Sequence, residues 1–478
     1  MFFKRKKICS CGSVKKFKDC CPDADKNPPS STIQGQACSL VDEGNALLSK
    51  SQHEKALDLY KEALSIYPDY ARAHYNSGLV YGILGKLEEA ATSYRKAIEI
   101  EPNDAEAHNN LAIILRKQGL QEEALTFYRK TLALNPKDAK AHNNLGVLLR
   151  ELGKIEEAAA SYEKAIAIWP EYTESHNNLG VIFFTQGKIE AAVSSFKQAL
   201  EFDANFAQAR IYMAIISWIA GMIESCEFNL SQISPNTNSI NKEDVNFVVP
   251  YHQYLTKLVA YRKTNPGLYE HNDTPPKLYL LGDSHSLSSA NLKIKYDNSE
   301  YLTETKIVIG CKAWHLANQE INQYKYGFEK RLESIPNGSK AILIYGEIDC
   351  RPNEGIVNHY KKYGNDLIQS ITDLIYNYTK YVLEKTVVKN IFPIFCNVPA
   401  RIYDYSLSID NNDLELHQEI LDIFNRVLKE RVNSLKIPLI DVYSITKEES
   451  AKTHRKYHID RNHLQPYVLK DLLEKKII

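Results

Sequence analysis

A period of 34 residues is the feature that most limits how this chain can fold. Histidines, aromatic residues and prolines recur with this step along the first half of the sequence. The positions are His74, His108, His142 and His176; Tyr60, Tyr94, Tyr128, Tyr162 and Phe196; and Pro68, Pro102, Pro136 and Pro170. A fixed period of this length indicates one supersecondary unit, copied several times, that buries its apolar face only by stacking on its neighbours.

The period and the residue pattern are those of the tetratricopeptide (TPR) repeat, in which each unit is a pair of helices. Small residues recur between the helices, at Gly44, Gly78, Ala112, Gly146 and Gly180 and at Ala56, Ala90, Ala124, Ala158 and Ala192. We therefore predict an all-α superhelix over residues 37–240, with five regular repeats (37–206) and a degenerate sixth (207–240). Trp218 departs from the pattern in the sixth repeat, as expected of a terminal capping repeat.

An asparagine occupies one equivalent position in four successive repeats. These residues are Asn76, Asn110, Asn144 and Asn178, and the last three lie in the string His-Asn-Asn-Leu. An amide offers both a donor and an acceptor, so a ladder of amides can pair with the backbone of an extended peptide. The ladder resembles that of O-linked N-acetylglucosamine transferases, which implies peptide clamping. The alternative is that the asparagines satisfy backbone groups between helices, which is the role we expect for the four histidines.

Four cysteines lie close together at the N-terminus, at Cys9, Cys11, Cys20 and Cys21. A segment this short has no core of its own, and four thiolates in two close pairs suit the tetrahedral sulfur coordination of structural zinc. The spacing resembles the SEC-C motif, CxCGSxxKxxxCC, a small docking module, and predicts a zinc site in residues 1–26. The alternative is a cysteine-rich tail that binds no metal.

The same segment is basic. Residues 1–26 carry eight Lys or Arg against three Asp. This charge favours an acidic partner, which can be a protein, a lipid surface or RNA, although a solvated basic face with no partner explains it equally well.

The period disappears after residue 240. We expect one extra helix near residues 251–262 and a linker, together spanning 241–274. Short apolar runs then alternate with segments of helix length. The runs are 277–281, 306–309, 341–345, 390–395 and 437–442. Such runs indicate strands buried on both faces, and we predict an α/β domain over 275–478 with a doubly wound parallel sheet.

Two motifs contain candidate catalytic residues, one directly after the first predicted strand and one near the end of the sequence. Gly282-Asp-Ser284-His places a serine at a strand end, and Asp460-Arg-Asn-His463 brings a carboxylate beside an imidazole. The pair of motifs resembles the SGNH, or GDSL-like, hydrolases, which implies a flavodoxin-like fold. The resemblance assigns Ser284 as nucleophile, Asp460 and His463 as orienter and base, and Gly310 as an oxyanion-hole donor. It implies an ester-bearing substrate, including carbohydrate O-acetyl esters, or acyl transfer, with no cofactor for catalysis.

One position departs from that family. The block Gly-x-Asn-Asp reads Gly346-Glu-Ile348-Asp here, and isoleucine cannot supply the hydrogen bond of the asparagine. Loss of one such donor costs about 10²- to 10³-fold in rate. Two hypotheses follow: an esterase or acyltransferase whose repeats recruit a peptide or protein, with His285 or Arg351 replacing the donor, or an adaptor that binds partners and carries a non-catalytic domain.

Composition excludes some classes of protein. Lys and Arg balance Asp and Glu at 59 each, so the whole chain lacks the basic surplus of a general nucleic-acid coat. The hydrophobic share of 44% excludes disorder along the whole chain. The longest apolar stretch, near residues 211–223, is shorter than the roughly 20 residues of a membrane span. We therefore expect a cytoplasmic protein with no membrane span.

Overall fold

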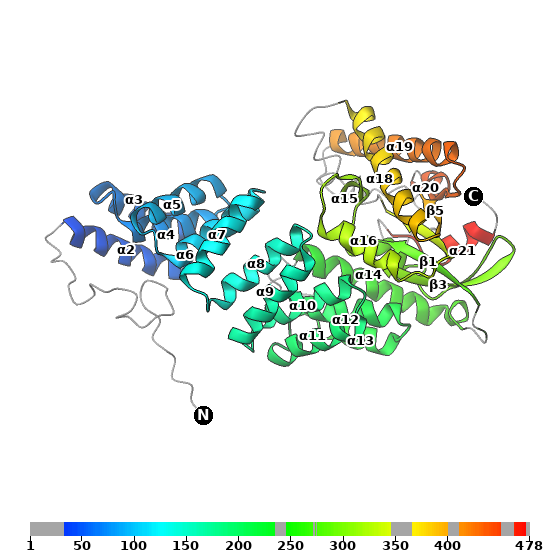
Figure 1. The fold of residues 1–478 in the computed structure, drawn as a ribbon, viewed down its shortest axis with the longest axis horizontal. Coiled ribbons are helices and arrows are strands. Elements are labelled where there is room, and N and C mark those ends of the chain that lie inside the picture. Colours follow the sequence, from blue (N-terminus) through cyan, green and yellow to red (C-terminus); the bar gives the residue numbers. More distant parts are fainter. Residues whose placement is uncertain are drawn as a thin grey trace. The chain divides into compact units, whose positions relative to one another are not determined.

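The computed structural model describes residues 33–234, 245–270, 273, 275–345, 366–399, 411–450 and 463–474 (Figure 1). The N-terminal cysteines, Ile348 and Asp460 lie outside these ranges. The chain divides into two compact units, one of Met1–Leu148 with Ala167–Trp169 and one of Leu149–Ile166 with Pro170–Ile478.

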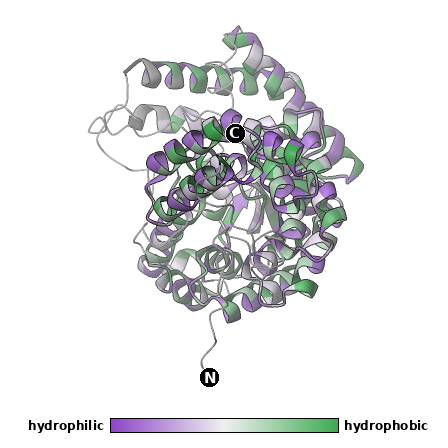
Figure 2. Cartoon of the chain, turned by 90° about the vertical axis from the view of Figure 1, so that its left-hand side faces the viewer, coloured by the Kyte–Doolittle hydropathy of each residue, from purple (hydrophilic) through white to green (hydrophobic). Residues whose placement is uncertain are grey.

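Helix pairs build the first unit. Its helices are α2 (Ile33–Ser49), α3 (His53–Ile66), α4 (Ala71–Ile83), α5 (Leu87–Ile100), α6 (Ala105–Lys117), α7 (Gln121–Leu134) and most of α8 (Ala139–Glu151). Hydrophobic and hydrophilic residues alternate around these helices (Figure 2), the pattern of helices that bury one face. The predicted helical repeats are therefore present in this unit.

A glycine ends the first helix of each regular repeat after the first. Gly85, Gly119, Gly153 and Gly187 have φ between +73° and +81°, a conformation that costs other residues about 1–2 kcal/mol. The next amide in each case bonds a carbonyl five residues back, as in Lys86 N to Tyr81 O. These bonds form the Schellman cap, which satisfies the last carbonyls of the helix.

The small residues of the pattern make room for the aromatic ones. A Cβ on Gly44 would lie 2.5 Å from the ring of Tyr60, and a Cβ on Gly180 would lie 2.7 Å from that of Phe196. Both rings are fully buried. In these two repeats an aromatic ring of the second helix therefore packs directly on a glycine of the first.

The second unit contains the later repeats and the α/β part. Its repeat helices are α9 (Ile155–Ile168, largely in this unit), α10 (Thr173–Thr185), α11 (Ile189–Phe202), α12 (Ala207–Ile219) and α13 (Ile223–Ser231), followed by α14 (Val245–Thr264) and the short 3-10 helix η2 (Pro266–Leu268). The predicted extra helix is α14, which starts six residues earlier than expected and packs on α12 and α13. No helix in the described ranges is long and apolar enough to cross a membrane.

A six-stranded sheet follows, in the order β2-β3-β1-β4-β5-β6. Its strands are β1 (Lys277–Gly282), β2 (Lys293–Tyr296), β3 (Ser299–Ile307), β4 (Lys340–Ile344), β5 (Phe392–Cys396) and β6 (Leu439–Ile440). The other elements are η3 (Ser284–Leu287), α15 (Ala313–Ala317), α16 (Gln323–Glu333), α18 (Leu367–Val388), α19 (Asn411–Ser434), α20 (Val442–Ser450) and α21 (Tyr467–Glu474).

The sheet is mixed, so the prediction of an all-parallel sheet is wrong at one edge. Five strands run parallel, but β2 pairs with β3 antiparallel. Asp297 and Asn298 connect them and both have positive φ, +52° and +62°. Two such residues form the tight turn that suits the twist of a hairpin, and Asp and Asn tolerate that conformation best after glycine.

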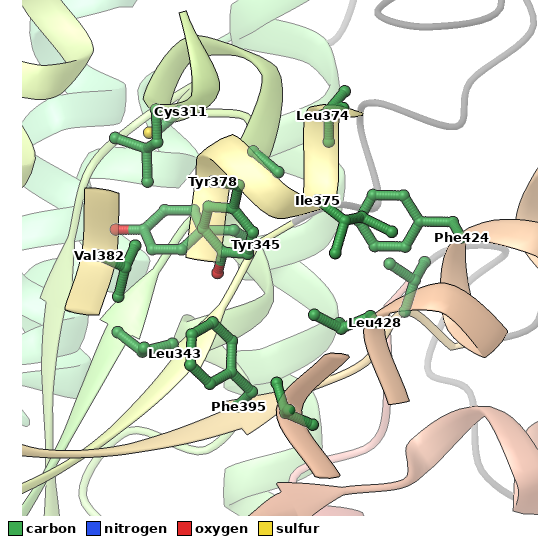
Figure 3. Close-up of a cluster of buried hydrophobic side chains, with 14 of the residues drawn as sticks. Cys311, Leu343, Tyr345, Leu374, Ile375, Tyr378, Val382, Phe395, Phe424 and Leu428 are labelled. Atoms are coloured by element: carbon green, nitrogen blue, oxygen red, sulfur yellow. The ribbon is translucent and has the colours of Figure 1, made fainter. Parts of the chain in front are cut away.

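Both faces of the sheet are covered. Leu281, Leu343 and Phe395 pack with residues of α15, α16, α18 and α19. In this cluster the ring of Tyr378 contacts those of Tyr345 and Phe395 (Figure 3). Leu278 and Leu280 face the other way and pack with α21. Alternate residues of one strand thus enter two cores, which explains the nearly continuous apolar runs.

The later repeats share a core with the α/β part. Residues of α10 to α14 form one buried cluster with Leu287, Ala290 and Ile307. Trp218 is fully buried in it, and its indole Nε1–H donates to the carbonyl of Leu287 at 2.8 Å. The sixth repeat therefore packs on the sheet part, and this contact accounts for the tryptophan that departs from the repeat pattern.

Candidate functional site

Ser284 follows the end of β1, where parallel strands carry their sites. The glycine before it has a steric cause, since a Cβ on Gly282 would lie 2.6 Å from Ile344 O. Asp283 caps η3, and its side chain accepts the backbone N–H of His285 at 2.9 Å. The cap and the close strand contact fix the turn that presents Ser284.

The structure brings His463 to Ser284 from 179 residues away in sequence. Ser284 Oγ lies 3.1 Å from His463 Nε2, and the two residues are only 7% and 8% exposed. An unprotonated Nε2 at this distance can accept the hydroxyl proton, which is the geometry required of a nucleophile and its base.

The imidazole of His463 packs against two other rings. Tyr254, on α14, stacks on it with ring centroids 3.7 Å apart, and the His285 ring lies 4.7 Å away. The sequence predicts a helix here but not the role of Tyr254, because a helical pattern does not indicate which residue reaches a distant loop. The helix that follows the repeats thus forms part of the site.

A second buried pair lies beside Ser284. His285 Nδ1 is 2.9 Å from Asp283 Oδ1, while Asp283 Oδ2 finds no hydrogen-bond partner among the described residues. Both residues are under 8% exposed. His285 is therefore tied to Asp283, and its ring lies near the base rather than free in solvent.

Gly310 lies just beyond β3, the strand next to β1. Its φ of +69° lies in the left-handed region, and an added Cβ would meet only Tyr324, at 3.6 Å. The backbone conformation, rather than lack of space, therefore calls for glycine here. The carboxyl ends of β1 and β3 place Ser284 and Gly310 on the same edge of the sheet.

Several predicted site residues lie outside the described ranges. These are Asp460, Ile348 and the zinc-site candidates Cys9, Cys11, Cys20 and Cys21. The orienting carboxylate, the third oxyanion donor and the metal site therefore stay predictions.

The asparagine positions carry hydrogen bonds to neighbouring side chains. In the first unit, Asn76 is buried and donates to Asn45 Oδ1 at 2.8 Å, and the half-buried Asn110 donates to the Tyr75 hydroxyl at 2.9 Å. Asn144, also half-buried, donates to Asn109 Oδ1 at 3.3 Å. Asn178, in the second unit, is half-buried as well.

The four histidines have a structural partner. Each Nε2 lies 2.8–3.1 Å from the carbonyl of the proline six residues earlier, in the pairs His74–Pro68, His108–Pro102, His142–Pro136 and His176–Pro170. The bond ties the start of one helix to the turn that precedes it. The structural interpretation of the histidines is confirmed.

Models of the tetratricopeptide repeat family match the repeat region. One, described as TPR repeat, matches residues 44–84 and 83–119, and another, described as tetratricopeptide repeat, matches 104–171 and 137–205. No curated protein matches the chain.

Several solved structures are similar to part of this chain. MamA is 26% identical, with 34% of this chain and 94% of that chain covered and a TM-score of 0.32. YrrB, described as a TPR protein with an unusual peptide-binding site, is 22% identical (41% and 97% covered, TM-score 0.32). PilF of Pseudomonas aeruginosa is 17% identical (47% and 99% covered, TM-score 0.40). On the family match, residues 44–205 of this chain are tetratricopeptide repeats.

Proposed function

We propose that the α/β part is a serine hydrolase of the SGNH type that acts on ester bonds, and that the repeats recruit a peptide or protein to it. The observation that carries the enzymatic half is the 3.1 Å approach of Ser284 Oγ to His463 Nε2 in a buried site. A serine hydroxyl is a weak nucleophile unless an adjacent base takes its proton.

The proposed reaction uses this pair directly. Ser284 Oγ attacks the ester carbonyl carbon while His463 Nε2 accepts the hydroxyl proton. The N–H groups of Ser284 and Gly310 stabilise the oxyanion that forms. The tetrahedral intermediate collapses to an acyl-serine, and the alcohol leaves with the proton from His463. Water then releases the acid, or an acceptor alcohol takes the acyl group.

The strand order supports this assignment. Without the edge strand β2, the parallel strands follow the order 2-1-3-4-5 in sequence, which is the order of doubly wound, flavodoxin-like sheets. In such sheets ligands bind where successive connections leave to opposite sides, here beside the end of β1. Ser284 lies at that point.

The recruiting role rests on the family match of residues 44–205. Stacked helix pairs create an extended surface that suits an extended chain. The half-buried Asn110, Asn144 and Asn178 supply amides at a repeated position. We propose that the peptide contacts the asparagines of the first unit, which are Asn110, Asn144 and Asn76, the last of which donates to Asn45.

A second function is favoured by one residue. Ile348 stands where the resemblance expects a donor asparagine. A domain without that donor can retain its fold while losing activity, in which case the protein is an adaptor that binds partners through its repeats.

Labelling of the purified protein with a fluorophosphonate probe tests the enzymatic half, with the modified residue located by mass spectrometry. We expect labelling at Ser284 that is lost in Ser284→Ala and in His463→Gln. Ser288→Ala is the matched control, because Ser288 is equally buried but donates to the carbonyl of His285. Absence of labelling in folded wild-type protein would favour the adaptor.

A further inference from the structure

A cavity lies beside the candidate site, within the second unit. It has a volume of about 250 Å³ and lies between the end of β3, α16 and the repeat helices. Gly310 forms part of its wall, so it borders the edge of the sheet that carries Ser284. Aromatic side chains of Phe184, Tyr212 and Tyr324 make up much of the rest.

Two arginines line this cavity, and among the described residues neither forms an ion pair. Arg331 is 7% exposed; its Nε donates to Ile307 O at 3.1 Å, and its Nη2 donates to Phe184 O. Its guanidinium also lies 4.7 Å from the Phe184 ring centroid. These contacts hold the group in place but bring no negative charge to it.

Arg150 is less satisfied still. Its Nε is buried, with no hydrogen-bond partner in the described part of the chain. Arg150 as a whole is half-buried, and Glu151, the next residue, acts on it through its charge. Burying a polar group costs free energy unless it is hydrogen-bonded, so the buried Nε is a donor available to an anion.

Neutral donors complete the lining. Burial raises the pKa of Tyr212 to about 12 and raises that of Tyr324 as well, so both hydroxyls stay protonated near neutral pH. Burial lowers the pKa of Arg331 to about 10, which leaves it charged there. The described residues that line the cavity include no Asp or Glu.

We propose that this cavity binds the oxyanion of a small molecule, a carboxylate or a phosphate group, between Arg150 and Arg331. The planar fork of arginine matches both groups with paired hydrogen bonds. The phenol hydroxyls add donors, and the aromatic walls suit the organic part of the ligand. The site does not depend on whether Ser284 is catalytic.

Binding of inorganic phosphate and of acetate tests the proposal. Full-length Ser284→Ala protein is titrated calorimetrically at constant ionic strength, with chloride as the balancing anion. We expect saturable binding of at least one oxyanion and a loss of affinity of tenfold or more in Arg150→Gln. Tighter binding of phosphate would indicate a phosphorylated ligand, and tighter binding of acetate would indicate a carboxylated one.

Arg426→Gln is the matched control, because Arg426 is exposed on α19 and pairs with Glu430. It should leave binding unchanged. If Arg150→Gln fails to fold, hydrogen exchange of the protein that keeps both arginines gives a second readout. The bound oxyanion should slow exchange of the backbone amides in α16. Binding no stronger than that of chloride, or binding that survives Arg150→Gln, would overturn the proposal.

Discussion

Replacing Trp218 tests whether the later repeats and the sheet part form one cooperative body. Trp218 lies on α12, is fully buried, and donates its indole N–H to Leu287 O at 2.8 Å. Leu287 ends the 3-10 helix that begins with Ser284. In Trp218→Phe the carbonyl loses this donor, while the aromatic packing is largely kept.

The expected cost has two parts. Leu287 O keeps its bond from the backbone N–H of Ala290 at 3.3 Å, so the carbonyl loses one of two hydrogen bonds, which costs about 0.5–1.5 kcal/mol. The smaller ring leaves about 40 Å³ unfilled, which costs about 1 kcal/mol at roughly 24 cal/mol per Å³. We therefore expect a loss of about 1.5–2.5 kcal/mol. At about 1.4 kcal/mol per factor of ten, exchange through opening of this body should accelerate roughly 10-fold or more.

Hydrogen exchange followed by mass spectrometry measures the effect segment by segment. Trp218→Phe should accelerate exchange in α12 and, equally, in the segment from Lys277 to Leu287. Tyr60→Phe is the control, because Tyr60 is also fully buried and loses its bond to Asn45, but within the first unit. If α12 opens faster while Lys277 to Leu287 keeps its protection, the shared core does not couple the two parts.

Three further predictions concern packing, pH and metal. Gly180→Ala should lower stability by about 1–3 kcal/mol in thermal unfolding, because its Cβ would lie 2.7 Å from the Phe196 ring; Gly267→Ala, with nothing within 4 Å, should not. Burial lowers the pKa of His315 from 6.5 to about 3, so the unfolded chain binds a proton that the folded chain does not. The free energy of unfolding should therefore fall as the pH drops below about 6.5. Urea titrations of His315→Gln should show a smaller decrease over the same pH range. The purified protein should contain one zinc ion by elemental analysis, and Cys21→Ser should lose it; a metal-free wild-type protein would contradict the zinc site.

The repeats could be predicted from sequence because their determinants are local and repeated. Each histidine meets a carbonyl six residues away, and each cap glycine serves its own helix, so the period alone locates them. Four of the five parallel strands were predicted for a related reason, since their apolar runs are set by burial on both faces. The predicted run 306–309 covers only the end of β3, which spans Ser299–Ile307. The hairpin strand β2 was missed although Asp297 and Asn298 signalled its turn, because its alternating residues do not form an apolar run.

The contacts between the repeats and the sheet part could not be predicted, because no local pattern encodes them. Trp218 departs from the repeat pattern, and from the sequence alone this departure indicated only a terminal repeat. Tyr254 was an unremarked residue on an expected helix, and the charges of Arg150 and Arg331 were two among many. Each acquires its meaning only from a partner that lies far away in the chain.

These contacts have a consequence for how the site works. His463 is stacked by Tyr254 of α14, and the turn that presents Ser284 is bonded to Trp218 of α12. The position of the proposed base and the start of the nucleophile turn therefore depend on helices that precede the sheet part. A fragment that begins at residue 275 would expose Leu287, Ala290 and Ile307, which are buried against those helices. Such a fragment would lack the ring that stacks on His463, so the proposed esterase activity requires the later repeats even for a substrate that never touches the asparagine ladder.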